Sequence, residues 1–333
     1  MMNDEFRHDL PPIPTTPEEI RAMEERQALE NACGMFNVKS ANQTLQDAAL
    51  RPNPVQLWKS LVYEGETCCM YGDSNVGKSV LGYQMASDIA ATRKVLYFDF
   101  ELSDKQFQLR YSDENGKLHE FPALLYRVEI NPETLEVGQD FEDVVIKNIE
   151  DIALAIDAKV IVVDNVTWLC NQSEKAEKAG VLMKSLLALK IKYGWTLVVV
   201  AHSPKRNMTS CITQNDLAGS KRLINLFDSA FAIGMSAKDP HLRYVKQIKI
   251  RSGELEYHAE NVLVYCLEKV GAFLQFTFMG YSTEREHLKE QSNDEKVALK
   301  DSIIQLQSEG KTYKQISTEL GISPATISRI LNK

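Results

Sequence analysis

The sequence predicts an α/β fold with a mainly parallel, twisted sheet, followed by a small all-α domain at the C-terminus. Three observations support this prediction. Residues 72–79 read G-x-x-x-x-G-K-S between a β-rich segment and a segment whose apolar residues repeat at helical spacing. Later runs of β-branched residues end in acidic or histidine side chains, which is typical of buried parallel strands. Residues 296–333 then change to short helical patterns separated by turns.

The composition is that of an ordinary globular protein, with 44% hydrophobic and 25% charged residues in a chain of 333. No apolar run reaches the length of a membrane span, and the N-terminus lacks the parts of a signal peptide, so we expect a cytoplasmic protein without a membrane partner. The net charge of −8 argues against general attraction to nucleic acid but permits a local basic surface. The six cysteines contain no C-x-x-C pair and indicate free thiols instead of a zinc site or a disulfide framework: Cys33, Cys68, Cys69, Cys170, Cys211 and Cys266.

Four segments are predicted along the chain. They are an N-terminal arm with a linker helix (1–50), the α/β domain (51–281), a polar linker (282–295) and the helical domain (296–333). Within the first segment, residues 17–34 have the pattern of one charged helix with a thin apolar face, made by Ile20, Met23 and Leu29, and a stop at Gly34. Because this face is too small to stabilise a helix alone, we expect it to pack on its own domain or on a neighbouring subunit.

The glycine-rich segment is predicted to bind the phosphates of ATP. Gly72 and Gly77 allow the backbone N–H groups to turn toward phosphate oxygens in front of a helix N-terminus. Lys78 should reach the β- and γ-phosphates, and the Ser79 hydroxyl should bind Mg²⁺. A chance glycine-rich turn is the alternative, which the flanking strand and helix disfavour. The nucleotide-binding residues are therefore Gly72, Asp73, Ser74, Asn75, Val76, Gly77, Lys78 and Ser79.

Two later strands place carboxylates near this loop. The run at 95–100 is followed by Glu101, and the run at 159–164 ends in Asp164. In open parallel sheets, functional residues gather at the carboxyl ends of the strands, so we expect Asp164 to hold Mg²⁺ through water. A helix N-cap is the alternative role for Asp164. Asp99 is interpreted as structural.

A third strand, at 196–201, is followed by His202 and then by a polar stretch without periodicity. Its position at a strand end favours a phosphate-sensing role for His202 over an ordinary buried or surface histidine. The polar stretch to Gly219 is interpreted as a functional or disordered loop. Lys249 and Arg251 alternate in KQIKIRSG and are predicted to share one side of a strand near the sheet edge, where a solvated strand face is the alternative.

Together, GDSNVGKS, FDFEL, VIVVDN, AHSPKRN and KIRSG resemble the motifs of RecA-like ATPases of the hexameric replicative helicase group, particularly plasmid-type and DnaB-like helicases. The resemblance covers about residues 50–280. It implies that Glu101 is the catalytic base, that His202 senses the γ-phosphate, and that Lys249 and Arg251 are fingers in the ATP site of an adjacent subunit. It therefore implies a homo-oligomer, a ring of six.

The same resemblance implies that the loops after Asp164 and His202 line a central channel and contact the DNA backbone. The basic candidates are Lys205, Arg206, Lys221 and Arg222, for which an ordinary solvated loop is the alternative. The sequence departs from the DnaB-like pattern because it shows no large N-terminal domain, which argues against processive unwinding at a replication fork.

The tail is predicted to form three helices, at about 295–308, 313–320 and 324–331, with Pro324 at the first position of the third. It resembles the DNA-binding helix-turn-helix of resolvase and invertase recombinases. It carries six basic residues against three acidic ones, opposite in sign to the whole chain. A helical protein-docking module is the alternative. The residues predicted to face DNA are Ser323, Ala325, Thr326, Ser328 and Arg329.

These observations lead to two hypotheses. The first is an ATP-hydrolysing, DNA-binding ring ATPase, a helicase or DNA translocase of a plasmid or mobile element, with replication or transposition proteins as possible further partners. The second is an ATP-switched DNA-binding regulator or loader without unwinding activity. Strand displacement distinguishes the two.

Overall fold

The computed structural model describes residues 16–18, 20–21, 23–24, 34, 36–131, 133, 141–166, 175–204, 206–217, 223–290, 293–320, 322 and 324–331. The chain divides into two compact units, Met1–Pro54 and Val55–Lys333. Among the described residues, no helix combines the length and the apolar character needed to cross a membrane.

The first unit contains α2 (Ala41–Ala49), which the sequence analysis missed. Ser40 caps this helix, because its hydroxyl accepts a hydrogen bond from the backbone of Gln43 at 3.1 Å. No side chain of α2 is buried, and Leu45 is exposed. The helix predicted within 17–34 lies largely outside the described residues.

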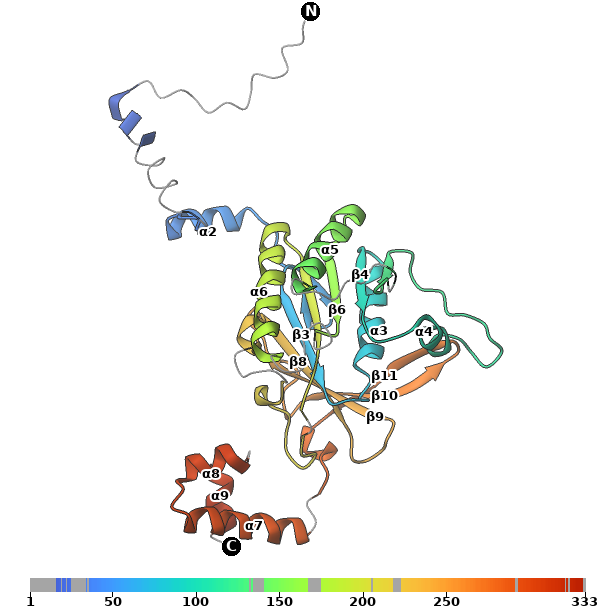
Figure 1. Ribbon diagram of the computed structural model, residues 1–333, viewed down its shortest axis with the longest axis vertical. Coiled ribbons are helices and arrows are strands. Elements are labelled where there is room, and N and C mark those ends of the chain that lie inside the picture. The colour runs from blue at the N-terminus through green and yellow to red at the C-terminus, as the bar shows by residue number, and fades with distance from the viewer. Residues whose placement is uncertain are drawn as a thin grey trace, which may run out of the picture. The chain divides into compact units, whose positions relative to one another are not determined.

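A nine-stranded sheet forms the centre of the described part of the second unit (Figure 1). Its order is β11-β10-β9-β8-β3-β7-β6-β4-β5. In chain order the strands are β3 (Thr67–Gly72), β4 (Val95–Asp99), β5 (Leu125–Val128), β6 (Val160–Asp164), β7 (Thr196–His202), β8 (Ser229–Met235), β9 (Leu242–Lys249), β10 (Val262–Val270) and β11 (Phe273–Ser282). A separate two-stranded sheet pairs β1 (Gln56–Trp58) with β2 (Val62–Tyr63).

The six strands from β8 to β5 run parallel, while β9, β10 and β11 continue the sheet in antiparallel fashion. The prediction of a mainly parallel sheet is confirmed. Strands β3, β4, β6, β7 and β8 are almost entirely buried, which their continuous apolar runs favour. Their carboxyl ends meet at one edge of the sheet, where the loop after β3 lies.

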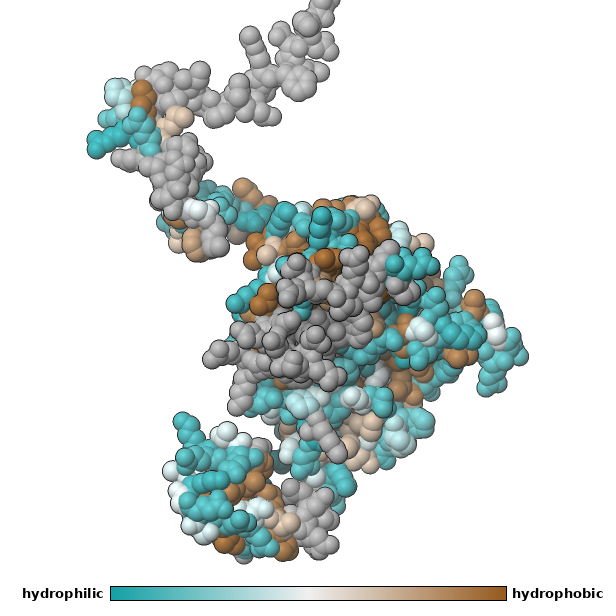
Figure 2. Space-filling model, in the orientation of Figure 1, coloured by the Kyte–Doolittle hydropathy of each residue, from teal (hydrophilic) through white to brown (hydrophobic). Residues whose placement is uncertain are grey.

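Helices cover both faces of this sheet (Figure 1). The helices α5 (Phe141–Ile156) and α6 (Lys175–Tyr193) pack on one face, where Ile149, Leu182 and Leu186 join a buried apolar cluster. The opposite face is covered by α3 (Lys78–Ala90), with α4 (Asp104–Arg110) beside it. The outer surfaces of α5 and α6 retain exposed apolar side chains, including Leu154 and Ile191, and Figure 2 shows hydrophobic colour in this region.

The strand that carries Lys249 is not at the sheet edge, and that prediction is wrong. The strand β9 lies between β8 and β10, because the long β10–β11 hairpin adds two strands beyond it. The strand also ends at Lys249, so Arg251 follows it instead of sharing one of its faces.

The segment predicted as a linker begins with packed structure. A 3-10 turn, η3 (Glu284–His287), follows β11, and its Glu284 and His287 are buried. Glu284 pairs with Lys246 of β9 at 2.5 Å and accepts a hydrogen bond from the backbone of Ile212 at 2.6 Å. The turn therefore anchors the polar loop that follows β7.

Three helices form the end of the chain: α7 (Asn293–Ser308), α8 (Tyr313–Leu320) and α9 (Pro324–Leu331). The bounds of α8 and α9 coincide with the predicted ones. The helices share a small core around Ile303, Ile316 and Ile327, which are fully buried. Such a core follows from the apolar spacing of the tail sequence.

Candidate functional site

The phosphate-binding loop connects β3 to α3 and requires glycine at two positions. A Cβ atom on Gly72 would lie 2.6 Å from the carbonyl oxygen of Ile233 on β8, so only glycine allows this approach. Gly77 has φ 94°, and Asn75 has φ 65°. These left-handed conformations turn the loop immediately before the first residue of α3, as a phosphate-binding loop requires.

Lys78, the first residue of α3, is buried at this loop. Its Nζ atom donates hydrogen bonds to the carbonyl oxygens of Gly72 at 3.0 Å and of Asp73 at 2.8 Å. Burial lowers the pKa of Lys78, while the charges of Asp164, Glu101 and Asp73 oppose that effect. The ammonium group is thus held beside the loop, where phosphate oxygens can replace the carbonyl oxygens as its partners.

Two residues that the sequence analysis missed brace the loop. Ser203, directly after β7, donates from its backbone to Gly72 at 3.0 Å and from its hydroxyl to the Asp73 carboxylate at 2.5 Å. Arg243 of β9 is buried, and its Nε atom donates to the carbonyl of Val76 at 3.0 Å. These contacts come from distant segments, so no local pattern could reveal them.

The buried carboxylate of Asp164 stands at the end of β6. It accepts a hydrogen bond from the Tyr97 hydroxyl at 2.6 Å, and the Ser79 side chain lies close enough to influence it. Burial raises the pKa of Asp164 to about 6, although Tyr97 and Ser79 act in the opposite direction. A serine hydroxyl beside a carboxylate is a set of hard oxygen donors that suits Mg²⁺, so Ser79 and Asp164 would hold this ion.

The side chains of Glu101, Asn165 and His202 meet next to Ser79 and Asp164. They stand at or just after the ends of β4, β6 and β7. Glu101 accepts a hydrogen bond from the Asn165 amide, whose Nδ2 atom lies 3.0 Å from Nε2 of His202. The His202 Nε2 atom lies 3.4 Å from Glu101 Oε1. Asn165 was missed, although its place directly after Asp164 at a strand end was a signal.

The environment keeps Glu101 ionised. The contact with His202 is the largest influence and lowers the pKa of Glu101, with support from Asn165 and Lys78, although partial burial opposes the shift. An ionised carboxylate at this position can orient a water molecule and accept its proton. The structure therefore brings Glu101 and His202 together near Lys78 and Asp164.

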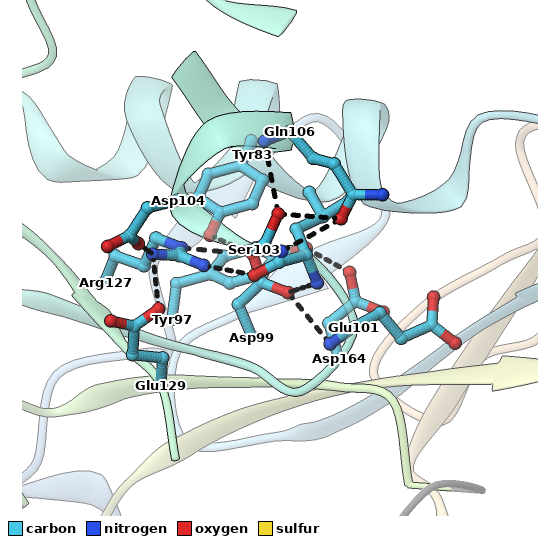
Figure 3. A network of polar contacts seen from close by, with 11 residues as sticks. Tyr83, Tyr97, Asp99, Glu101, Ser103, Asp104, Gln106, Arg127, Glu129 and Asp164 are labelled. Carbon is cyan, nitrogen blue, oxygen red and sulfur yellow. Dashed lines mark hydrogen bonds and ion pairs between the residues drawn. The ribbon is translucent and has the colours of Figure 1, made fainter. Parts of the chain in front are cut away.

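Asp99 is occupied by structural contacts (Figure 3). Its buried carboxylate accepts hydrogen bonds from the backbone of Glu101 at 3.2 Å and of Leu102 at 3.0 Å, and from the Tyr83 hydroxyl at 2.9 Å. Arg127 forms an ion pair with it at 3.2 Å. With its oxygens engaged, Asp99 is a poor candidate for the base.

The structure separates Lys249 and Arg251 from the phosphate-binding loop of their own chain. Lys249 pairs with Ala230 at the start of β8, whereas Gly72 pairs with Ile233 near its end. Lys249 donates to the carbonyl oxygen of Phe227 at 2.7 Å. Both residues therefore lie toward the amino-terminal ends of the parallel strands, away from the phosphate-binding loop.

Arg251 is more accessible than Lys249. Its side chain is 58% exposed and forms an ion pair with Asp228 at 2.9 Å. Lys249 is half-buried, and burial lowers its pKa. Of the two predicted fingers, Arg251 is the one that a neighbouring subunit could reach without disrupting buried contacts.

The predicted DNA contacts are only partly described. Lys205, Lys221, Arg222 and Ser323 lie outside the described residues, as does the side chain of Ala325. Arg206 is half-buried and donates to the carbonyl of Ser210, so it turns into its own loop instead of outward. On α9, Arg329 is exposed, while Thr326 and Ser328 are half-buried.

The fold and the site define a P-loop nucleotide-binding domain. Residues 37–208 match the family model of the AAA domain, and the chain belongs to this family. The fold is also similar to that of a KaiC-like protein, PH0186, from the hyperthermophilic archaeon Pyrococcus horikoshii OT3. That similarity has a TM-score of 0.51 and 14% sequence identity, and covers 69% of this chain and 100% of that chain. No curated protein sequence matches the chain.

Proposed function

We propose that this protein is an ATP-hydrolysing, DNA-binding ring ATPase, a helicase or DNA translocase of a plasmid or mobile element. The observation that carries the hydrolytic part is the meeting of Glu101, Asn165 and His202 beside Lys78 and Asp164. Phosphoryl transfer to water requires positioning and charge stabilisation, and this group of side chains offers both.

Each side chain has a task in this proposal. Lys78 binds the β- and γ-phosphates of ATP, and Ser79 and Asp164 hold Mg²⁺. Bound Mg²⁺ neutralises charge on the phosphates. Glu101 orients the attacking water and accepts its proton, and His202 responds to the γ-phosphate through its contacts with Glu101 and Asn165.

The assignment of fingers to a neighbouring subunit rests on the separation of Arg251 from its own loop. The six-residue strand β3 separates the two ends of the sheet, a distance of roughly 15–20 Å. A cation at that end can serve an ATP site only if that site belongs to another copy of the chain. The exposed apolar side chains of α5 and α6 offer additional surface for assembly.

The tail supports the DNA-binding part. Its three helices share one small core, and α9 presents Arg329 to solvent. An exposed arginine on the last helix of such a unit can contact phosphate or base edges in the major groove.

The inward orientation of Arg206 favours the second hypothesis, an ATP-switched DNA-binding regulator or loader, because it removes one cation from the proposed channel.

DNA-stimulated ATPase activity at low salt, where phosphate contacts are strongest, tests the proposal. We expect single- or double-stranded DNA to raise the rate, and an unchanged rate would exclude a DNA motor. A strand-displacement assay then separates the two hypotheses. Unwinding supports the motor, whereas tight ATP-dependent DNA binding without unwinding supports the switch.

A further inference from the structure

We propose that Arg127 is the positioning residue for Glu101, and this inference rests on the proposed role of Glu101 as the catalytic base. Arg127 lies on β5, the strand next to β4 at the edge of the sheet. No sequence motif contains it, and it does not touch Glu101 in any contact that the structure describes.

The guanidinium group of Arg127 spans the segment that carries Glu101 (Figure 3). On one side of Glu101, its Nε atom pairs with Asp99 at 3.2 Å. On the other side, Nη2 donates to the carbonyl of Leu102, and Nη1 pairs with Asp104 at 2.6 Å. A further ion pair at 2.9 Å joins the guanidinium to Glu129, the residue that follows β5. The two ends of the short segment 99–104 are thus fixed by one side chain.

Asp99 transmits this restraint to Glu101. Its Oδ1 atom accepts the backbone N–H of Glu101 at 3.2 Å and that of Leu102 at 3.0 Å. Its Oδ2 atom accepts the hydroxyl of Tyr83, which belongs to α3, the helix that begins at Lys78. The backbone of Glu101 is therefore held relative to the phosphate-binding helix, through buried groups that water cannot easily replace.

The geometry requires arginine at this position. The group contacts acceptors in several directions at once, and a planar guanidinium has five N–H donors, whereas a lysine ammonium is a compact point charge. The guanidinium also stacks over Phe107 of α4 at 5.0 Å, which restricts its orientation. The Arg127 side chain is 16% exposed and that of Asp99 only 2%, so the ion pair between these two residues is poorly screened by solvent.

Measurements of kcat and of nucleotide affinity, by steady-state phosphate release and titration with a fluorescent ATP analogue, test this inference. Misplacing a catalytic group by about 1 Å costs about a hundredfold, so Arg127→Met should lower kcat between about tenfold and a hundredfold, with affinity changed by less than about twofold. Arg127→Lys, which keeps the charge, should fall between Arg127→Met and the parent. The matched control Arg93→Met removes an exposed arginine that pairs with Glu64 at 3.7 Å, and should leave both quantities unchanged.

The double variant Glu101→Gln/Arg127→Met separates positioning from general stability. Because Arg127 acts through Glu101, its removal should lower the single-turnover rate by less than about twofold when Glu101 is already Gln. An equal loss in both backgrounds, or a loss of affinity matching the loss of kcat, would overturn the inference. If Arg127→Met does not fold, the inference is instead overturned when Arg127→Lys has the same kcat as the parent protein. Glu101→Gln alone tests the proposed function, since parental turnover there would remove Glu101 as the base.

Discussion

At the scale of single residues, substitution of Lys78 should lower nucleotide affinity, whereas substitution of Glu101 should lower turnover. Lys78→Ala removes a buried charge at the phosphate-binding loop, and hydrogen bonds to charged groups contribute about 1.5–3 kcal/mol. We therefore expect nucleotide affinity to fall about tenfold to a hundredfold, measured by titration with a fluorescent ATP analogue.

Glu101→Gln should keep ATP bound and lower turnover by about a hundredfold or more. Near-normal turnover of Glu101→Gln would assign the base to another group.

Asp164 should make the stability of the metal-free protein depend on pH. Burial raises the pKa of its carboxyl from 3.8 to about 6 in the folded protein. Between these two values the unfolded chain loses the proton while the folded protein keeps it, so this group lowers stability as pH rises, by about 3 kcal/mol in total above pH 6. Asp164→Asn should remove this loss.

Urea unfolding of the parent and of Asp164→Asn at pH 4 and at pH 7.5, without Mg²⁺, measures this effect. The unfolding free energy of Asp164→Asn, minus that of the parent, should be larger at pH 7.5 than at pH 4. A difference that does not change with pH would show that Asp164 is already ionised throughout, and that its contacts with Tyr97 and Ser79 outweigh burial.

At the scale of elements, the packing of α3 on β4 depends on a glycine. A Cβ atom on Gly82 would lie 2.6 Å from the Tyr97 hydroxyl oxygen, the same hydroxyl that donates to Asp164. Alanine normally stabilises a helix interior relative to glycine by about 1 kcal/mol, but overpacking a core costs about 1–3 kcal/mol. Gly82→Ala should therefore destabilise the protein in urea unfolding.

Adding Tyr97→Phe should relieve part of that cost, because the substitution removes the oxygen atom that the new methyl group at position 82 would meet. The double variant should be more stable than the sum of the two single effects predicts. Gly180→Ala in α6 is the control, since a Cβ atom there meets nothing within 4 Å, and it should stabilise the protein. Strict additivity of Gly82→Ala and Tyr97→Phe would refute the proposed contact.

At the scale of the whole molecule, hydrolysis should require more than one copy of the chain. An arginine finger contributes about a thousandfold or more to phosphoryl transfer, so Arg251→Ala should be almost inactive while still binding ATP. Mixing Arg251→Ala with Glu101→Gln should restore some activity, because some mixed interfaces pair an intact base with an intact finger. The measurement is phosphate release from mixtures that are shown to co-assemble. Absence of recovery in such mixtures would mean that Arg251 acts within its own chain or only in structure, for example through its ion pair with Asp228.

The loop, the strand ends and the tail helices could be predicted because local pattern determines them. The motif at 72–79 combines the two glycines that the backbone conformation needs with the lysine and serine of the chemistry. Continuous β-branched runs indicated the buried parallel strands and so placed Asp164 and His202 at one sheet edge. The apolar spacing of the tail gave the bounds of α8 and α9.

Tertiary structure alone decided which of these segments meet. Strand order placed β9 inside the sheet, because the sequence of a strand does not specify its neighbours. The contacts of Arg127 with Asp99 and Asp104, and of Arg243 with the carbonyl of Val76, join residues far apart in the chain. Arg206 has the pattern of an ordinary loop cation until its carbonyl partner is known. Local sequence determines conformation over a few residues, whereas the positions of charged groups relative to one another depend on how the strands are ordered and packed.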